Sequence, residues 1–259
     1  MAIIHFLGTC SGTEPMVGMH HSSFVIKVGE KNYWFDAGEN CSHTAHISGI
    51  DLLNTRALFL SHMHVDHTGG LANLLFCFSK LMWRENRQLI HNNTLDIYAP
   101  DLKLLHAIKS VACNHTEDHS GIRFQINETQ THDGLLFEDE SIRVTALHNR
   151  HLGEDGSHGW HSYSFLIELD GKRIVFSGDV HTPNELDALI GNGCDLLIME
   201  TGHHAVVDVC DYAVSHNTKR LYFTHHGREI IGDRAAAEAL VATYPIDIKL
   251  AYDNMIEEI

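Results

Sequence analysis

Residues 62–67 read His62-Met63-His64-Val65-Asp66-His67 and directly follow the apolar run Ala57-Leu58-Phe59-Leu60. The side chains of His62, His64, Asp66 and His67 can all bind a metal ion, because neutral imidazoles and carboxylates are the usual ligands of Zn²⁺, Mn²⁺ and Fe²⁺. The apolar run predicts a strand, so the cluster lies where a strand ends. From there His62 and His64 can reach one ion, whereas Asp66 and His67 begin the next turn and face a second ion. Two ions need further ligands from elsewhere in the chain.

The same arrangement, an apolar strand that ends in a metal-competent residue, recurs further along the sequence. The residues at these strand ends are Asp36, His148, Asp179, Glu200 and His225. In a layered α/β protein, ligands bind in the crevice outside the carboxyl ends of the strands. The sequence therefore predicts that these side chains converge on one edge. Most of the other histidines, of 23 in the chain, fit no such pattern and are expected to be incidental.

The cluster resembles the His-x-His-x-Asp-His signature of the metallo-β-lactamase superfamily. The fold of that superfamily is α/β, a four-layer αββα sandwich that carries two ions between its sheets. Several other segments are similar to the ribonuclease Z branch of the superfamily: residues 6–15, 33–39, 176–179, 196–201, 223–225 and 251–254. The resemblance covers nearly the whole chain and implies cleavage of a phosphodiester. The length of 259 residues suits a single domain over residues 1–259.

The resemblance also implies a set of ligands for two divalent ions. The ligands of the first ion are His62, His64 and His148. The ligands of the second ion are Asp66, His67 and His225. Asp179 bridges the two ions. His151, three residues beyond His148, is an alternative to it, and Asp36 either orients the ligating histidines through hydrogen bonds or caps a turn.

A general acid is implied at the mouth of the site. The phosphodiesterases of the family place a histidine there, at a fixed distance before the last ligand and paired with the strand-end glutamate. His203 lies 22 residues before His225, which matches that distance. His203 is therefore the predicted general acid and Glu200 its orienting partner. Neighbouring His204 is the alternative, and a purely structural role for both imidazoles, as caps of the helix at residues 206–214, is the competing interpretation.

Helices and a hairpin are expected between the ligand-bearing segments. A helix at residues 70–83 should bury Leu71, Leu74, Leu75, Phe78 and Met82, and a second helix begins at Asp233 and runs through Thr243. A helix that follows Asp101 should bury one stripe, formed by Leu102, Leu105, Ile108 and Val111. Residues 162–169 and 172–176 form a hairpin around Asp170-Gly171, a strong turn signal.

The hairpin bears on the substrate. The ribonuclease Z enzymes insert a long flexible arm, which grips tRNA, between the ligands that match His148 and Asp179. Here that interval is 31 residues, and the loop at residues 149–161 together with the hairpin fills it. No room remains for an arm, so maturation of tRNA is not expected, and the loop at residues 150–160 is expected to form one lip of the pocket.

The charge balance also disfavours a polyanionic partner. The formal net charge is −16, from 34 acidic and 18 basic residues, and non-specific nucleic-acid binding draws its affinity from lysines and arginines that neutralise phosphates. A stable complex with nucleic acid is therefore not expected. Bound metal ions add local positive charge, so a small phosphodiester remains an acceptable substrate.

The sequence predicts a cytoplasmic protein that does not enter a membrane. No stretch approaches the roughly 18 apolar residues of a membrane span, and no secretory leader precedes the first strand at residues 2–7. The six cysteines are scattered without a Cys-x-x-Cys pair, which is typical of free thiols in a reducing compartment.

The expected function is two-metal hydrolysis of small phosphodiesters, cyclic nucleotides or short oligonucleotides. A hydroxide that bridges the ions attacks phosphorus, Asp66 helps to hold it, and His203 protonates the departing oxygen. Hydrolysis of another bond, such as a thioester or lactone, and RNA processing of the ribonuclease Z type are the alternatives. Zn²⁺ is the default metal, while Mn²⁺ and Fe²⁺ stay open because ligand type does not separate them. The resemblance allows a homodimer, for which the sequence offers no evidence of its own.

Overall fold

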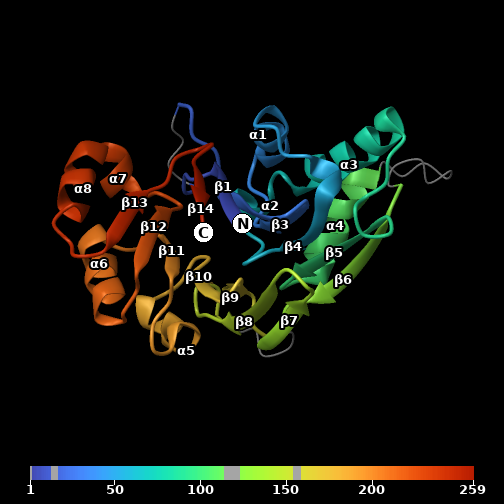
Figure 1. The fold of residues 1–259 in the computed structure, drawn as a ribbon. Helices are drawn as coiled ribbons and strands as arrows, with labels where there is room; N and C mark the ends of the chain where they lie inside the picture. The colour runs from blue at the N-terminus through green and yellow to red at the C-terminus, as the bar shows by residue number, and fades with distance from the viewer. Residues whose placement is uncertain (1, 13–16, 114–122, 154–158) are drawn as a thin grey trace. The chain divides into compact units, whose positions relative to one another are not determined.

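The chain divides into two compact units, each built on one sheet (Figure 1). The structure is a computed structural model that describes residues 2–12, 17–113, 123–153 and 159–259. Unit 1 consists of Met1–Gly8, His20–Gln130 and Asp253–Ile259, and unit 2 of Thr9–Met19 and Thr131–Tyr252.

The sheet of unit 1 has the strand order β14-β1-β2-β3-β4-β5-β6. Its strands are β1 (Ala2–Gly8), β2 (Ser23–Val28), β3 (Lys31–Phe35), β4 (Thr55–Phe59), β5 (Thr94–Ala99), β6 (Gln125–Gln130) and β14 (Ile256–Glu258). The helices of the unit are α1 (Cys41–Ile47), η1 (Leu52–Asn54), α2 (Val65–Thr68), α3 (Leu71–Glu85) and α4 (Leu102–Cys113). Strands β3 to β6 run parallel to one another, so their carboxyl ends lie at one edge of the sheet.

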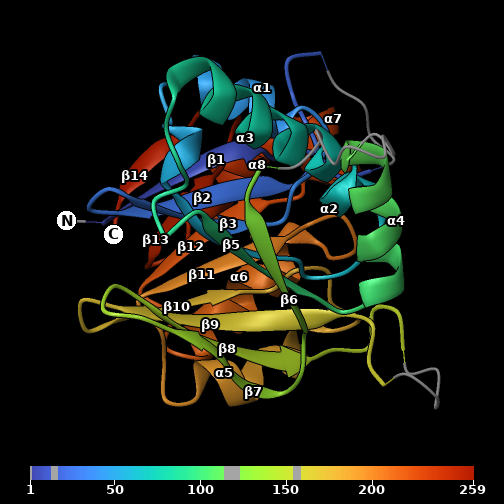
Figure 2. The same ribbon diagram turned by 90° about the vertical axis from the view of Figure 1, so that its right-hand side faces the viewer.

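Helix α3 covers one face of this sheet and packs beside α4 (Figure 2). The five side chains predicted for its core face, Leu71, Leu74, Leu75, Phe78 and Met82, are all buried, which confirms the prediction. They pack against sheet residues such as Trp34, Leu58 and Ile97. Each such side chain contributes roughly 1.5–3 kcal/mol when it leaves water. The opposite face of the sheet carries a ladder of buried rings with neighbouring centroids 5.0–5.8 Å apart: Phe6, Phe24, Phe35, Phe59 and Tyr98.

Helix α4 begins where the sequence predicts, but its buried stripe is shorter than expected. The carboxylate of Asp101 accepts hydrogen bonds from the backbone N–H groups of Lys103 and Leu104 and so caps the helix. Leu105 is fully buried, whereas Val111 is 74% exposed, so its place in the stripe was predicted wrongly. Each step of three residues falls about 60° short of a full helical turn, and three such steps carry position 111 to the other side of the helix from position 102.

The sheet of unit 2 has the strand order β13-β12-β11-β10-β9-β8-β7. Its strands are β7 (Gly134–Glu138), β8 (Arg143–His148), β9 (Tyr163–Leu169), β10 (Lys172–Phe176), β11 (Leu196–Glu200), β12 (Arg220–Thr224) and β13 (Asp247–Leu250). Its helices are η2 (Pro183–Leu186), α5 (Asp187–Ile190), α6 (Val206–Ser215), α7 (Arg228–Gly232) and α8 (Arg234–Val241). Helices α6 and α8 pack on this sheet through residues such as Val209 and Ala237.

The predicted hairpin is confirmed, because β9 and β10 pair antiparallel on either side of Asp170-Gly171. Strands β10, β11 and β12 are parallel neighbours, and β8 runs in the same direction because it is antiparallel to β9. The carboxyl ends of these four strands therefore share one edge of the sheet. The start of the predicted helix at Asp233 is also confirmed, since its carboxylate caps α8.

In the part of the chain that the structure describes, no helix is long and apolar enough to cross a membrane. Among the described residues no disulfide joins the five cysteines Cys10, Cys41, Cys77, Cys194 and Cys210, in line with the prediction. The side chain of Cys113 lies outside the described residues.

Candidate metal centre

Asp36 organises the potential ligands of unit 1. It follows β3 directly, and its N–H donates to the carbonyl of Phe59 at the end of β4, so the parallel ladder places it beside Ser61. The buried carboxylate of Asp36 accepts hydrogen bonds from the N–H and the hydroxyl of Ser61 at 2.7 and 2.8 Å. It also lies 2.7 Å from Nδ1 of His67. Because Nδ1 faces this carboxylate, Nε2 is the atom of His67 that could bind a metal ion, and the contact is the one expected of an orienting Asp36.

The cluster at residues 62–67 gathers at the start of α2. His64 is the residue before the helix, and its carbonyl accepts a hydrogen bond from the N–H of His67. The imidazole of His62 lies 4.0 Å from that of His67 and 4.6 Å from that of His64, measured between ring centroids. A carboxylate oxygen of Asp66 is 3.6 Å from Nε2 of His67. Unit 1 thus brings together all four of its predicted ligands.

The edge of the sheet in unit 2 gathers three imidazoles around the carboxylate of Asp179. One carboxylate oxygen of Asp179 lies 3.7 Å from Nε2 of His151, 3.8 Å from Nδ1 of His203 and 3.6 Å from Nε2 of His225. Hydrogen bonds from nitrogen to oxygen span about 2.7–3.2 Å, so these separations are too long. They are close to the separation of about 3.4 Å between neighbouring donors around a tetrahedral ion with bonds of about 2.1 Å. The donor types and their spacing both fit a divalent metal ion.

His148 is not part of this cluster, although it ends β8 as predicted. Its ring stacks on Trp160 with centroids 4.0 Å apart and planes 13° apart. Its Nδ1 lies 2.7 Å from the carboxylate of Asp133, which also accepts a hydrogen bond from the backbone N–H of His148. Among the described residues, the histidine of this loop that joins Asp179 and His203 within 4.8 Å is His151. The structure therefore favours His151, the alternative, over His148.

The turn after β8 explains this exchange. Asn149 is buried, and its side-chain oxygen accepts a hydrogen bond from the N–H of His151, while its amide donates to Ser164. This turn follows the strand directly, and His151 lies beside Asp179. The position of His151 is thus set by a side-chain-stabilised turn rather than by the end of the strand.

His225 follows β12 with a left-handed backbone, at φ 48°, and its ring lies against Gly202. A Cβ at position 202 would come within 2.7 Å of Nδ1 of His225. Glycine is therefore needed at position 202, because any side chain there would displace the imidazole. The next residue, His226, is fully buried and its Nε2 faces the carbonyl of Ala251 at 2.8 Å. Burial lowers the pKa of His226 to about 4, which suits a neutral, structural histidine.

Glu200 holds His203 at the edge of the cluster. One oxygen of its buried carboxylate lies 3.0 Å from Nδ1 of His203, and the other accepts a hydrogen bond from the N–H of His203 at 2.9 Å. Burial alone would raise the pKa of Glu200, but hydrogen bonds from His203 and His204 outweigh it and lower the pKa to about 2. The ring of His203 is 45% exposed, whereas His204 is largely buried and turns its Nε2 to the carbonyl of Val180. Of the two neighbours, His203 is the one next to Asp179.

The role of Asp36 gives a first test. Asp36→Asn keeps the size of the side chain and suits the left-handed backbone at φ 58°, but an amide cannot accept all three hydrogen bonds made by the carboxylate. We expect metal affinity, measured by competition with a chelator, to fall by about 10- to 100-fold, as for other residues that orient ligands. Asp51→Asn, which alters a carboxylate elsewhere in unit 1, should leave it unchanged. Equal affinities in the two variants would refute the orienting role.

These two sheets with flanking helices and strand-end histidines define a protein of the metallo-β-lactamase fold. The chain belongs to the family described as "Anti-Pycsar protein Apyc1", whose model matches residues 2–238. The metallo-β-lactamase fold protein YhfI from Bacillus subtilis has a similar structure, with a TM-score of 0.76 and 17% identity over 99% of this chain and 98% of that chain.

Two ribonucleases Z are among the relatives. The enzyme from Methanothermobacter thermautotrophicus is 26% identical over an alignment of 314 residues, which covers 100% of this chain and 97% of the relative. The enzyme from Listeria monocytogenes is 32% identical over 169 residues, which is 64% of this chain. That match spans about half of the relative, 49% of its length. The predicted fold and the resemblance to the ribonuclease Z branch are confirmed.

Some residues that shape the site were not predicted. Ser61, Asp133 and Trp160 each contact a histidine or a carboxylate that the sequence singled out. The sequence does carry a signal for Ser61, because it is the polar residue between the apolar run that ends at Leu60 and His62. Asp133 and Trp160 leave no such signal, because each contacts His148 from a distant part of the sequence.

Proposed function

We propose that the protein is a metal-dependent phosphodiesterase that hydrolyses small phosphodiesters, including cyclic nucleotides. The observation that carries this proposal is the pairing of His203 with Glu200 beside the carboxylate of Asp179. A metal site alone would suit many hydrolases. An imidazole that is held at the cluster by a buried carboxylate, and is still accessible to solvent, supplies the proton donor that a poor alkoxide leaving group needs.

The ligands that we propose for the metal ions come from both units. One ion would be held by His62, His64 and His151. The other would be held by Asp66, His67 and His225. Asp179 would contribute to both. This assignment rests on membership of the family, on the donor types and on the ligand-like spacing within each unit. Mixed imidazole and carboxylate donors suit Zn²⁺, and also Mn²⁺ or Fe²⁺.

When bound, divalent ions supply charge that neutralises phosphoryl oxygens and lowers the pKa of water. The residues of the chain do the rest. Asp36 fixes the ring of His67 through Nδ1, and Asp66 helps to hold the attacking water. Glu200 binds Nδ1 of His203, so Nε2 is the atom that donates a proton to the leaving oxygen. A histidine suits this step because its ordinary pKa, about 6.5, lies close to neutral pH.

Two features support a small substrate over a folded RNA. Between His148 and Asp179 the described residues include β9 and β10 of the sheet, and residues 154–158 lie outside the described part of the chain. The net charge of −16 would repel a long phosphate backbone over about 8 Å at physiological salt. A small diester avoids most of this repulsion.

RNA processing is the second candidate, because a relative named ribonuclease Z aligns over the whole chain. The alignment of 314 residues exceeds the 259 residues of this chain, so the relative carries segments that this chain lacks. Absence of those segments favours the small substrate. A homodimer and a cytoplasmic location also remain part of the proposal.

Substrate size provides the test. Metal-analysed protein should hydrolyse bis(p-nitrophenyl) phosphate or cyclic nucleotides and should cleave a tRNA precursor weakly or without specificity at physiological salt. Thioesters and lactones, assayed in parallel, should turn over far more slowly. Efficient, site-specific trimming of the precursor without turnover of small diesters would overturn the proposal in favour of a ribonuclease. Preferential turnover of a thioester or lactone would overturn it as well.

A further inference from the structure

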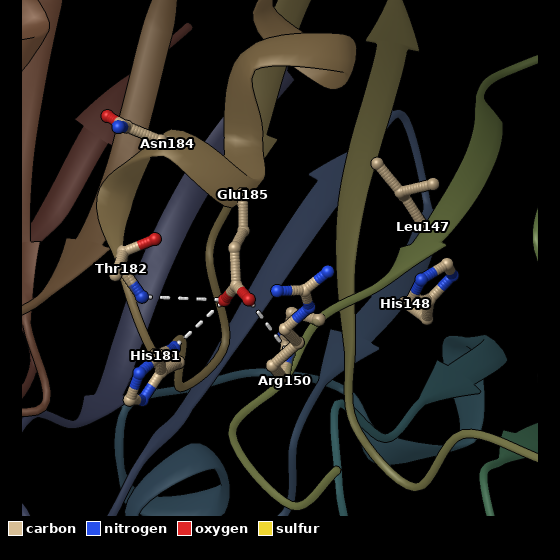
Figure 3. Close-up of a pocket in the computed structure, with 8 residues that line it drawn as sticks. Leu147, His148, Arg150, His181, Thr182, Asn184 and Glu185 are labelled. Carbon is tan, nitrogen blue, oxygen red and sulfur yellow. Dashed lines mark hydrogen bonds between the residues drawn. The ribbon is translucent and has the colours of Figure 1, made fainter. Parts of the chain in front are cut away.

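A pocket of about 350 Å³ lies in unit 2, between the loop after β8 and the loop after β10 (Figure 3). This volume is within the range of about 300–1,000 Å³ usual for small-molecule sites. Its lining residues are Leu147, His148, Asn149, Arg150, His181, Thr182, Asn184 and Glu185. The two loops also carry His151 and Asp179, one residue after Arg150 and two residues before His181. The pocket is thus formed by the loops that present ligands.

Glu185 ties the two loops together. One of its carboxylate oxygens accepts a hydrogen bond from the N–H of Arg150 at 3.1 Å, and the other accepts from the N–H of His181 at 2.9 Å (Figure 3). Backbone N–H groups thereby satisfy the carboxylate without using the guanidinium of Arg150. The shape of the pocket is therefore set before any ligand binds, and a preformed pocket loses less entropy on binding.

His148 forms a flat, fixed wall of this pocket. Trp160 stacks on one face of its imidazole and is not among the residues that line the pocket, whereas His148 is one of them. Asp133 holds both the Nδ1 atom and the backbone N–H of His148, which prevents the ring from turning. A ring fixed in this way is a stacking platform, and stacking is a general way to bind a flat heterocycle.

The remaining lining groups are hydrogen-bond donors and acceptors. Arg150 has no ion pair with a carboxylate in the part of the chain that the structure describes, and its side chain is exposed. Asn184 offers an amide and Thr182 a hydroxyl. Such groups match the ring nitrogens and exocyclic oxygens of a nucleobase. An alkyl substituent has no donor or acceptor that could pair with these groups.

We propose that this pocket binds the base of a nucleotide substrate, with His148 as the stacking platform and Arg150 as a hydrogen-bond donor. The proposal rests on the phosphodiesterase function above and extends it, because it assigns the specificity of the enzyme to residues outside the metal ligands. His148 is then a binding residue for the substrate and not a ligand for the metal.

The test compares one substrate that carries a base with one that does not. His148→Ala should raise KM for 2′,3′- or 3′,5′-cyclic nucleotides about 10-fold, within the range expected for loss of one stacked base. It should leave kcat/KM for methyl p-nitrophenyl phosphate within about twofold and leave the metal content unchanged. His148→Phe keeps a flat ring and should restore most of the lost affinity. Arg143→Ala, which removes an arginine of the same strand that pairs with Glu138 and Glu168 instead, is the matched control.

A binding measurement separates failure of this inference from failure of the proposed function. Nucleoside monophosphates should bind the wild-type protein in calorimetry, more tightly than methyl phosphate, and His148→Ala should remove that difference. This result would support the pocket even if no phosphodiester were hydrolysed. Equal affinity for nucleoside monophosphate and methyl phosphate in the wild type would overturn the inference, as would equal losses for both substrates in His148→Ala.

Discussion

Asp179→Ala should remove at least one of two metal ions per chain. Its carboxylate lies within 3.6–3.8 Å of three imidazoles, so it is the member of the set in unit 2 that all the others surround. Without it, a second ion would lack a charged ligand, and the repulsion between the two ions would be less well compensated. Elemental analysis of dialysed protein should give close to two ions for the wild type and one or none for the variant.

Four further variants make this result specific. Asp133→Ala removes a carboxylate of the same unit that binds His148, and it should keep both ions. His151→Ala should lose metal, and His148→Ala should not. Asp179→Asn, which preserves the shape of the buried side chain, distinguishes loss of a ligand from loss of the fold. Unchanged stoichiometry in both Asp179 variants, with the fold intact by circular dichroism, would refute the bridging assignment.

The choice between His148 and His151 shows where the sequence stops being informative. The strand-end positions of Asp36, Asp179, Glu200 and His225 could be predicted because apolar runs mark the strands, and within each sheet the parallel strands bring their ends to one edge. The position of His151 after β8 depends on a turn, which the side chain of Asn149 closes. A shift of three residues within a loop leaves the hydrophobic pattern unchanged, so the pattern could not decide between the two histidines.

The same limit applies to the histidine pair after β11. The sequence identified Glu200 as the end of a strand and left His203 and His204 as alternatives. Packing separates them, because Glu200 contacts both imidazoles while Val180 takes the Nε2 of His204. Helix periodicity predicts the buried face of α3 correctly, because its apolar residues alternate spacings of three and four. It fails at Val111 of α4, because apolar residues at a repeated spacing of three drift around the helix.

His203→Ala should keep its metal ions and lose turnover. In the proposal, His203 donates a proton from Nε2 and is not a ligand, so its removal leaves the coordination of both ions intact. Loss of a general acid typically lowers the rate by roughly 10²- to 10⁴-fold. The fall in kcat should be largest for cyclic nucleotides, whose alkoxide leaving group needs the proton, and smallest for p-nitrophenyl diesters, whose leaving group departs as a stable anion.

His204→Ala is the matched control, since the ring of His204 is turned to a backbone carbonyl, and this variant should retain far more activity. If both variants lost metal, the two imidazoles would have a structural role. If only His204→Ala showed a fall in kcat that depends on the leaving group, the general acid would be His204. If kcat of His203→Ala fell equally for good and poor leaving groups, His203 would instead be assigned to substrate binding. The reason is that only proton donation by this ring contributes more to the rate as the departing oxygen becomes more basic.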